Sequence, residues 1–108
     1  MKIAAILALL AAFVSSTAVA TTTRAKIAVV STSPMKIGGT GFRSRERVTV
    51  TLVTTGQYRK VVRANANGAF TATFAGVSIA YCQGYFVRAK GNRGSLAVIK
   101  LIPECPSG

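Results

Sequence analysis

The sequence has no histidine and no aspartate, and its only carboxylate side chains are Glu46 and Glu104. General acid–base catalysis uses histidine or tuned carboxylates, so the usual catalytic groups are missing. The serines and threonines have no candidate base beside them, and no glycine-rich phosphate loop precedes a helix. Zinc and calcium sites need more histidine, cysteine or carboxylate ligands than this chain offers. We therefore expect a protein that is not an enzyme and holds no metal or cofactor.

Cysteine is equally scarce, since Cys82 and Cys105 are the only two. Two thiols are too few for a metal centre in a chain without histidine. In an oxidising compartment, a small domain with a limited core is commonly stabilised by a disulfide. We expect one disulfide between Cys82 and Cys105, which stabilises the fold by roughly 3 kcal/mol in the chain-entropy model.

Long apolar runs are confined to the start of the chain, at residues 3–14. Lys2 precedes this run, and Ala18-Val19-Ala20 follows it as a small-x-small cleavage motif. A membrane-spanning helix is the alternative, but it needs roughly 20 apolar residues. Residues 1–20 are therefore interpreted as a secretory signal peptide. We expect residues 21–108 to form one mature domain without a transmembrane segment, in the extracellular space or the periplasm.

Negative charge is almost absent, because 14 Lys and Arg face only 2 Asp and Glu, for a net charge of +12. A field of one sign favours anionic partners such as nucleic acid, anionic lipid headgroups or acidic polymers. The alternative is that the charge only keeps a small protein soluble. The expected partner is an anionic polymer or surface, or an acidic protein, and the expected oligomeric state is a monomer.

Alternation of apolar and polar residues organises the rest of the chain. Val48, Val50 and Leu52 alternate with Thr49 and Thr51, which is the period of a half-buried strand. Similar segments recur with turn residues between them, including Asn65 to Gly68, and no amphipathic helix is visible. The pattern predicts an all-β fold, a single sandwich of about seven antiparallel strands. The expected strands are residues 26–33, 35–41, 47–54, 57–64, 69–75, 84–90 and 95–102.

The cysteines and the alternation disagree on the register of the last hairpin. If Cys82 lies directly opposite Cys105, Val87 lies opposite Lys100, yet directly opposite residues share a sheet face. The alternation instead places Val87 opposite Ile99 or Leu101. A bulge, or a loosened ladder beyond Pro103, would reconcile the disulfide with the alternation.

An ordered set of motifs also points to a family. The segment from residue 39 to 50 fits G-x-G-F-x-P-G-E-x-V-x-V, and later segments fit A-x-x-x-G-x-F, G-x-Y-x-V-x-A-x-G and G-S-x-A. The set resembles bacterial immunoglobulin-like modules of the IPT/TIG type, which are common in exported proteins. The resemblance implies an Ig-like sandwich with an adhesive, spacer or ligand-presenting role. The matching residues are Gly39, Gly41, Phe42, Glu46, Val48, Val50, Ala64, Gly68, Phe70, Gly84, Tyr85, Val87, Ala89, Gly91, Gly94, Ser95 and Ala97.

The chain departs from this pattern where the family has Pro-Gly, because it has Ser44-Arg45. In a seven-strand sandwich, the connections after the second, fourth and sixth strands share one end. We therefore expect basic residues from distant segments to meet there, with the cysteines at the other end. The candidate anion-binding residues are Arg43, Arg45, Arg47, Lys90 and Arg93. A secondary basic patch is expected at Arg59, Lys60 and Arg63 on the fourth strand, with Arg59 and Arg63 on one face and Lys60 pointing the other way or lying at the ragged start of the strand. The alternative is that this charge only protects an exposed edge strand from aggregation.

Three functional hypotheses follow. The first is a secreted, non-catalytic binding module whose basic tip engages an anionic surface or polymer, such as cell envelope, glycan or extracellular nucleic acid. The second is a structural or protein-interaction domain of an exported complex, with incidental charge. The third is a small effector that disrupts anionic membranes, which the lack of a basic amphipathic helix disfavours.

Overall fold

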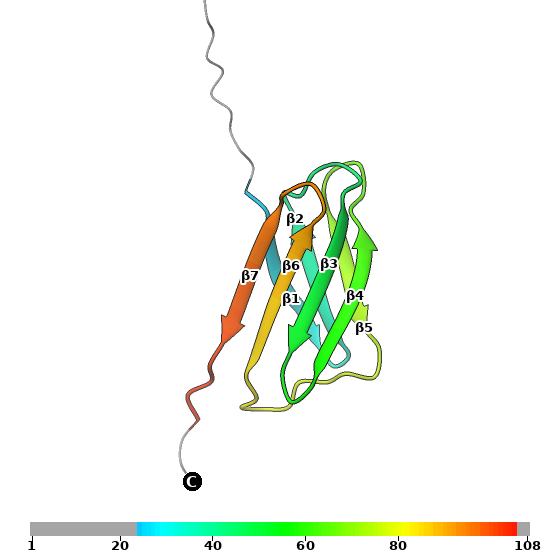
Figure 1. Ribbon diagram of the computed structural model, residues 1–108. Coiled ribbons are helices and arrows are strands. Elements are labelled where there is room, and N and C mark those ends of the chain that lie inside the picture. Colours follow the sequence, from blue (N-terminus) through cyan, green and yellow to red (C-terminus); the bar gives the residue numbers. More distant parts are fainter. Residues whose placement is uncertain (1–23, 106–108) are drawn as a thin grey trace, which may run out of the picture.

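The computed structural model describes residues 24–105, which form two layers of antiparallel strands (Figure 1). This confirms the predicted all-β sandwich of seven strands. The predicted signal peptide, residues 1–20, lies outside the described residues. The part of the chain that the structure describes has no helix that could cross a membrane. The strands are β1 (Lys26–Thr32), β2 (Met35–Thr40), β3 (Arg47–Val53), β4 (Gln57–Arg63), β5 (Phe70–Phe74), β6 (Tyr85–Gly91) and β7 (Leu96–Leu101).

The strands divide into a three-stranded sheet, in the order β1-β2-β5, and a four-stranded sheet, in the order β4-β3-β6-β7. The connections β2–β3, β4–β5 and β6–β7 meet at the upper end of the molecule in Figure 1. The connections β1–β2, β3–β4 and β5–β6 lie at the opposite end, together with the C-terminal segment. Residues that are far apart in the sequence are therefore neighbours at each end.

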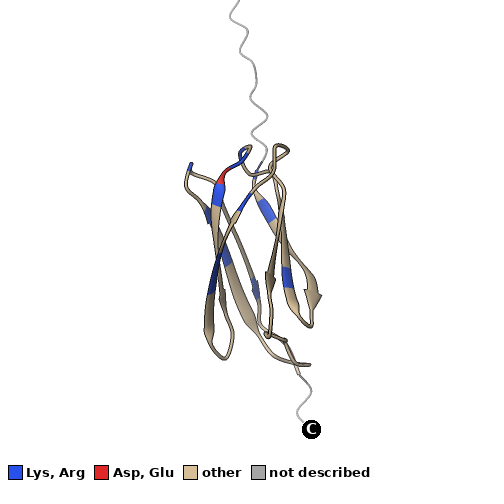
Figure 2. Ribbon diagram, turned by 90° about the vertical axis from the view of Figure 1, so that its right-hand side faces the viewer, with Lys and Arg blue, Asp and Glu red and all other residues tan. Residues whose placement is uncertain are grey.

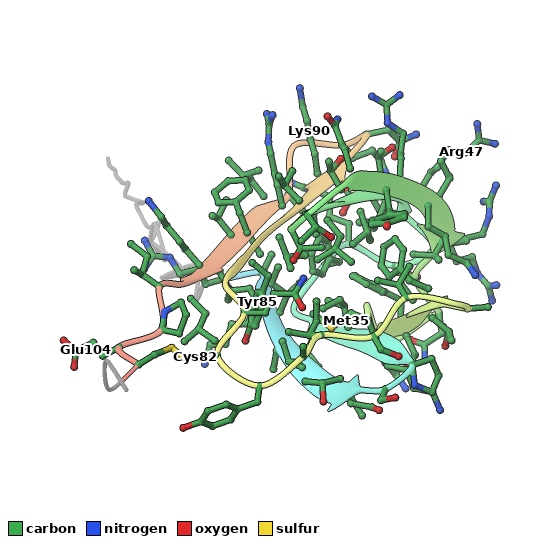
Figure 3. The ribbon with its side chains drawn as sticks, turned by 90° about the horizontal axis from the view of Figure 1, so that it is seen from below. Met35, Arg47, Cys82, Tyr85, Lys90 and Glu104 are labelled. Atoms are coloured by element: carbon green, nitrogen blue, oxygen red, sulfur yellow. A yellow bond between two sulfur atoms is a disulfide. The ribbon has the colours of Figure 1, made fainter. Side chains whose placement is uncertain are left out.

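Alternation along the strands builds the core between the two sheets. Val48, Val50 and Leu52 are fully buried, as the alternation predicted. From the other sheet, Met35 and Ile37 are also fully buried, and Figure 3 shows Met35 between the layers. Among the aromatic residues, Phe42, Phe70 and Phe74 are buried, and Tyr85 is partly buried against the core. The Phe42 and Phe70 rings pack edge to face, 5.0 Å apart.

The last hairpin follows the alternation rather than the cysteines. Val87 lies opposite Ile99, and the ladder between β6 and β7 ends at Tyr85 and Leu101. Cys82 and Cys105 lie beyond this ladder and form the predicted disulfide, with their Cα atoms 5.9 Å apart. The two constraints are compatible because both cysteines lie in irregular segments, where no strand register links them.

Candidate functional site

Glu46 is the buried centre of the upper end, with a side chain that is fully buried among exposed neighbours. Its Oε1 atom accepts hydrogen bonds from the Arg43 backbone N–H at 2.9 Å and from the Ser95 hydroxyl at 2.6 Å. Its Oε2 atom accepts from the backbone N–H groups of Arg93 at 2.7 Å and Ser95 at 3.3 Å. The carboxylate therefore ties the β2–β3 connection to the β6–β7 connection.

These hydrogen bonds determine the charge state of Glu46. Burial by itself raises the pKa of the carboxyl group, because it removes water from the charged form. The Ser95 hydroxyl and the N–H groups of Arg43, Arg93 and Ser95 have the opposite effect and lower the pKa from 4.5 to about 2. Glu46 is thus ionised at neutral pH. Backbone N–H groups and Ser95, and not the neighbouring arginine side chains, hold it in the charged form.

Two glycines allow the loops to approach this closely. A Cβ atom at Gly91 would lie 2.1 Å from Glu46 Oε2, so a side chain there would displace the carboxylate. A Cβ atom at Gly68 would lie 2.1 Å from the Phe42 carbonyl oxygen, and the φ angle of Gly68 is +79°. The Phe42 N–H donates to the Gly68 carbonyl at 3.1 Å, which joins the β4–β5 connection to the same end.

Residues 43–46 form a tight turn that presents the arginines. The Glu46 N–H donates to the Arg43 carbonyl at 3.1 Å, and Arg45 at the third position has a φ angle of 58°. A type II turn has a positive φ at this position and favours glycine there. The left-handed conformation costs roughly 1–2 kcal/mol for a residue with a Cβ atom. The Arg45 N–H donates to the Asn65 carbonyl at 3.0 Å, which holds the turn against the β4–β5 connection.

Two further arginines donate to this turn. The Arg93 guanidinium donates to the Ser44 carbonyl, and Arg63 Nη1 donates to the Arg45 carbonyl at 3.4 Å. The side chains of Arg43 and Arg45 are exposed, and neither forms a hydrogen bond within residues 24–105. Arg93 therefore has a structural contact, whereas Arg43 and Arg45 project from the turn as cations available to a partner.

Arg47 and Lys90 do not lie in the turn; they lie on the outer face of the four-stranded sheet. Arg47 lies directly opposite Arg63 at the ends of β3 and β4, and Lys90 lies opposite Thr49 on the neighbouring strand pair. Figure 3 shows the Arg47 and Lys90 side chains pointing outward on the same side of the sandwich. Directly opposite like charges repel each other, so the pairing of Arg47 with Arg63 adds no stability.

The residues of the predicted secondary patch lie on two faces of β4, as the alternation along this strand predicts. Arg59 and Arg63 lie on the outer face of β4, but Lys60 belongs to the other face, where Nζ donates to the Thr73 carbonyl at 2.8 Å. Lys60 thereby links β4 to β5 at the side of the sandwich. Arg63 contacts the turn through the Arg45 carbonyl, so it belongs with the loop residues. We call the exposed cations Arg43, Arg45, Arg47, Arg63 and Arg93 the basic tip.

Sequence reasoning did not find how Glu46 organises this tip. Arg43 is a local partner of the carboxylate, but Arg93 and Ser95 lie 47 and 49 positions further along the chain, so no local pattern relates them to Glu46. The sequence signal for this arrangement is an acidic residue, Glu46, within a basic segment, together with the distant pair Gly94-Ser95. Comparisons with known proteins do not extend this reading: no protein-family model, curated protein or solved structure matches the chain.

Proposed function

We propose that the protein is a secreted, non-catalytic binding module whose basic tip engages an anionic polymer or surface. Guanidinium groups bind phosphate, carboxylate or sulfate groups through charge and hydrogen bonds, without any chemical step. Cell-envelope polymer, acidic glycan and extracellular nucleic acid all carry such groups. The binding is electrostatic and therefore weakens as the salt concentration rises.

The observation that carries this proposal is the conformation of Arg45. Its φ angle of 58° belongs to a turn position where glycine is less strained, yet the side chain is exposed and makes no hydrogen bond within the described residues. Backbone strain of this kind is commonly retained at functional sites. Because no hydrogen bond within residues 24–105 uses the Arg45 guanidinium, a partner outside the chain is the simplest reason for its presence.

The proposal includes an Ig-like module of the IPT/TIG type. In support, the residues that carry this resemblance have specific structural roles, since Glu46 bridges two loops and Gly91 leaves room for its carboxylate. The chain differs at the turn, where the family's Pro-Gly would suit a type II turn and Ser44-Arg45 is found instead. Ser44-Arg45 therefore places a cation at a turn position where Pro-Gly would place none.

The test compares two variants that each remove two charges. The tip variant carries Arg43→Ser and Arg45→Gly, and the control variant carries Lys26→Ser and Lys36→Ser on the three-stranded sheet. Arg93 is left unchanged because its contact with Ser44 makes it part of the loop framework. Binding of the exported, oxidised protein to fluorescent polyphosphate, an acidic glycan and single-stranded DNA is measured across a salt series.

We expect the tip variant to bind more weakly, with a slope against log salt that falls by about one for each cation lost. We expect its thermal stability to be equal to or higher than that of the wild type, because Arg45→Gly relieves the left-handed strain. The control variant keeps most of the affinity. Equal weakening of both variants, or no binding by the wild type, would refute the proposed tip.

A further inference from the structure

The outer face of the four-stranded sheet differs sharply from that of the three-stranded sheet. Strand register places Arg63 beside Arg47, Arg59 in line with Thr51 and Arg88, and Lys90 beside Leu96. Lys100 joins the same face opposite Phe86. The cations of this face, which we call the sheet platform, are Arg47, Arg59, Arg63, Arg88, Lys90 and Lys100, and all six are exposed.

No acidic residue balances these cations within the described residues. Glu46 is buried among the loops, and Glu104 lies in the segment that follows β7. The outer face of the three-stranded sheet carries Lys26 and Lys36 only. Figure 2 shows this asymmetry, with blue segments at the upper loops and along the four-stranded sheet, and fewer on the other layer.

The sheet platform also carries exposed apolar side chains, which distinguishes it from the tip. Val61, Leu96 and Val98 are 54 %, 52 % and 47 % exposed on this face. Two of them lie directly beside cations, because Leu96 pairs with Lys90 and Val98 pairs with Arg88. Neighbouring strands are about 4.8 Å apart and alternate residues about 7 Å apart, so cations and aliphatic groups interleave over a surface roughly 20 Å across.

The combination of cations and exposed aliphatic side chains distinguishes between the classes of anionic partner that could bind this face. A water-soluble polyanion contacts the cations and leaves the aliphatic side chains in water. Single-stranded nucleic acid uses aromatic side chains for stacking, and Phe86, which is partly buried, is the aromatic residue on this face. An anionic bilayer matches both components, because headgroups bind Lys and Arg while the interface accepts Val and Leu.

We propose that the sheet platform docks flat on an anionic lipid bilayer. Its cations lie among the headgroups, and Val61, Leu96 and Val98 enter the interface between them. The inference does not rest on the proposed function of the tip, because the residues that test it lie outside the tip. Docking of this kind holds the protein on the surface and needs no membrane-spanning segment.

The test uses vesicles of phosphatidylcholine with and without phosphatidylglycerol, and soluble polyphosphate as the competing class of anion. An apolar variant carries Val61→Thr, Leu96→Thr and Val98→Thr, which keeps the charge and suits β-strands. A charge variant carries Arg88→Gln and Lys100→Gln, and its matched control carries Lys26→Gln and Lys36→Gln. The substituted side chains are exposed except for Lys36, which is partly buried, and thermal melting verifies the fold of each variant.

We expect the wild type to bind only the vesicles that contain phosphatidylglycerol. The charge variant loses roughly 25-fold in partition coefficient, at about fivefold for each of two cations, whereas its control changes much less. The apolar variant loses about tenfold on vesicles and nothing on polyphosphate.

Unchanged vesicle binding by the apolar variant would overturn the proposal. If the charge variant then weakened polyphosphate binding alone, the occupant of the platform would be a soluble polyanion. Equal losses in the charge variant and its control would show that the platform is not a site. These outcomes are separate from the tip, since the tip hypothesis is tested by polyanion binding of the wild type and of the variant with Arg43→Ser and Arg45→Gly.

Discussion

Acidification provides a direct test of the buried carboxylate at the upper end. Glu46 is fully buried and ionised, and its four hydrogen bonds connect two loops. Protonation removes the charge that these donors stabilise. Because the sequence has only one other carboxylate side chain, Glu104, the acid stability of the domain depends on very few side chains.

The size of the effect follows from the pKa of Glu46, which falls from 4.5 to about 2 in the folded state. Each pH unit between the two values corresponds to about 1.4 kcal/mol, so the ionised carboxylate stabilises the fold by roughly 3 kcal/mol. A lowered pKa means that this stability is fully present above pH 4.5. It is lost progressively as the pH falls from 4.5 toward 2.

The assay is urea unfolding of the oxidised protein at a series of pH values from neutral to about pH 2. Glu46→Gln turns an amide N–H₂ toward backbone donors, so we expect it to lose roughly 3 kcal/mol at neutral pH and most of the pH dependence. Ser95→Ala is the milder change, and it shifts the acid transition to higher pH because one lowering contact is lost. Glu104→Gln serves as the control and leaves the transition in place.

The reasoning is refuted if the wild type keeps its stability down to pH 2. It is also refuted if Glu46→Gln shows the same slope as the wild type between pH 4.5 and 2, because another group would then titrate.

Two further predictions concern stability. Gly91→Ala places a Cβ atom 2.1 Å from Glu46 Oε2 and is expected to destabilise the fold by roughly 3 kcal/mol, measured by urea unfolding. Gly38→Ala, whose Cβ atom would meet only the Val30 side chain at 3.0 Å, should change stability by less than about 1 kcal/mol. A Cys82→Ser and Cys105→Ser double variant removes a crosslink across 23 positions and should lose roughly 3 kcal/mol. Reducing agent should reproduce this loss in the wild type and leave the variant unaffected, and a loss below about 1 kcal/mol would contradict it.

The strands were predictable because alternation is a local property. Val48, Val50 and Leu52 must share a face in any extended segment, and each predicted strand appears within one or two residues of its expected bounds. The meeting of Arg43, Arg45 and Arg93 at one end followed from strand count, since alternate connections of a sandwich share an end. The cysteine pairing followed from number alone, because the chain has only two.

Strand partners were less predictable, because pairing depends on residues far apart in the chain. β4 pairs with β3 in the four-stranded sheet. This pairing places Arg63 beside Arg47 and turns Lys60 toward β5, where it donates to the Thr73 carbonyl. Arg88 and Lys90 alternate along β6 and share a face from the sequence alone, but Lys100 joins that face only through the register of β6 and β7. The sheet platform could not be identified before that register was known.

The sequence alone determined the all-β class, the seven strands, the single disulfide and the excess of positive charge, because composition and period-two alternation are local. Only the tertiary structure decided what the charges and the lone acidic residue of the tip do. Glu46 is stabilised by N–H groups and a hydroxyl from a connection nearly fifty positions away. Arg45 has a left-handed backbone conformation, and its N–H donates to the Asn65 carbonyl. Long-range contacts of this kind arise when the two sheets pack together, and no local segment encodes them.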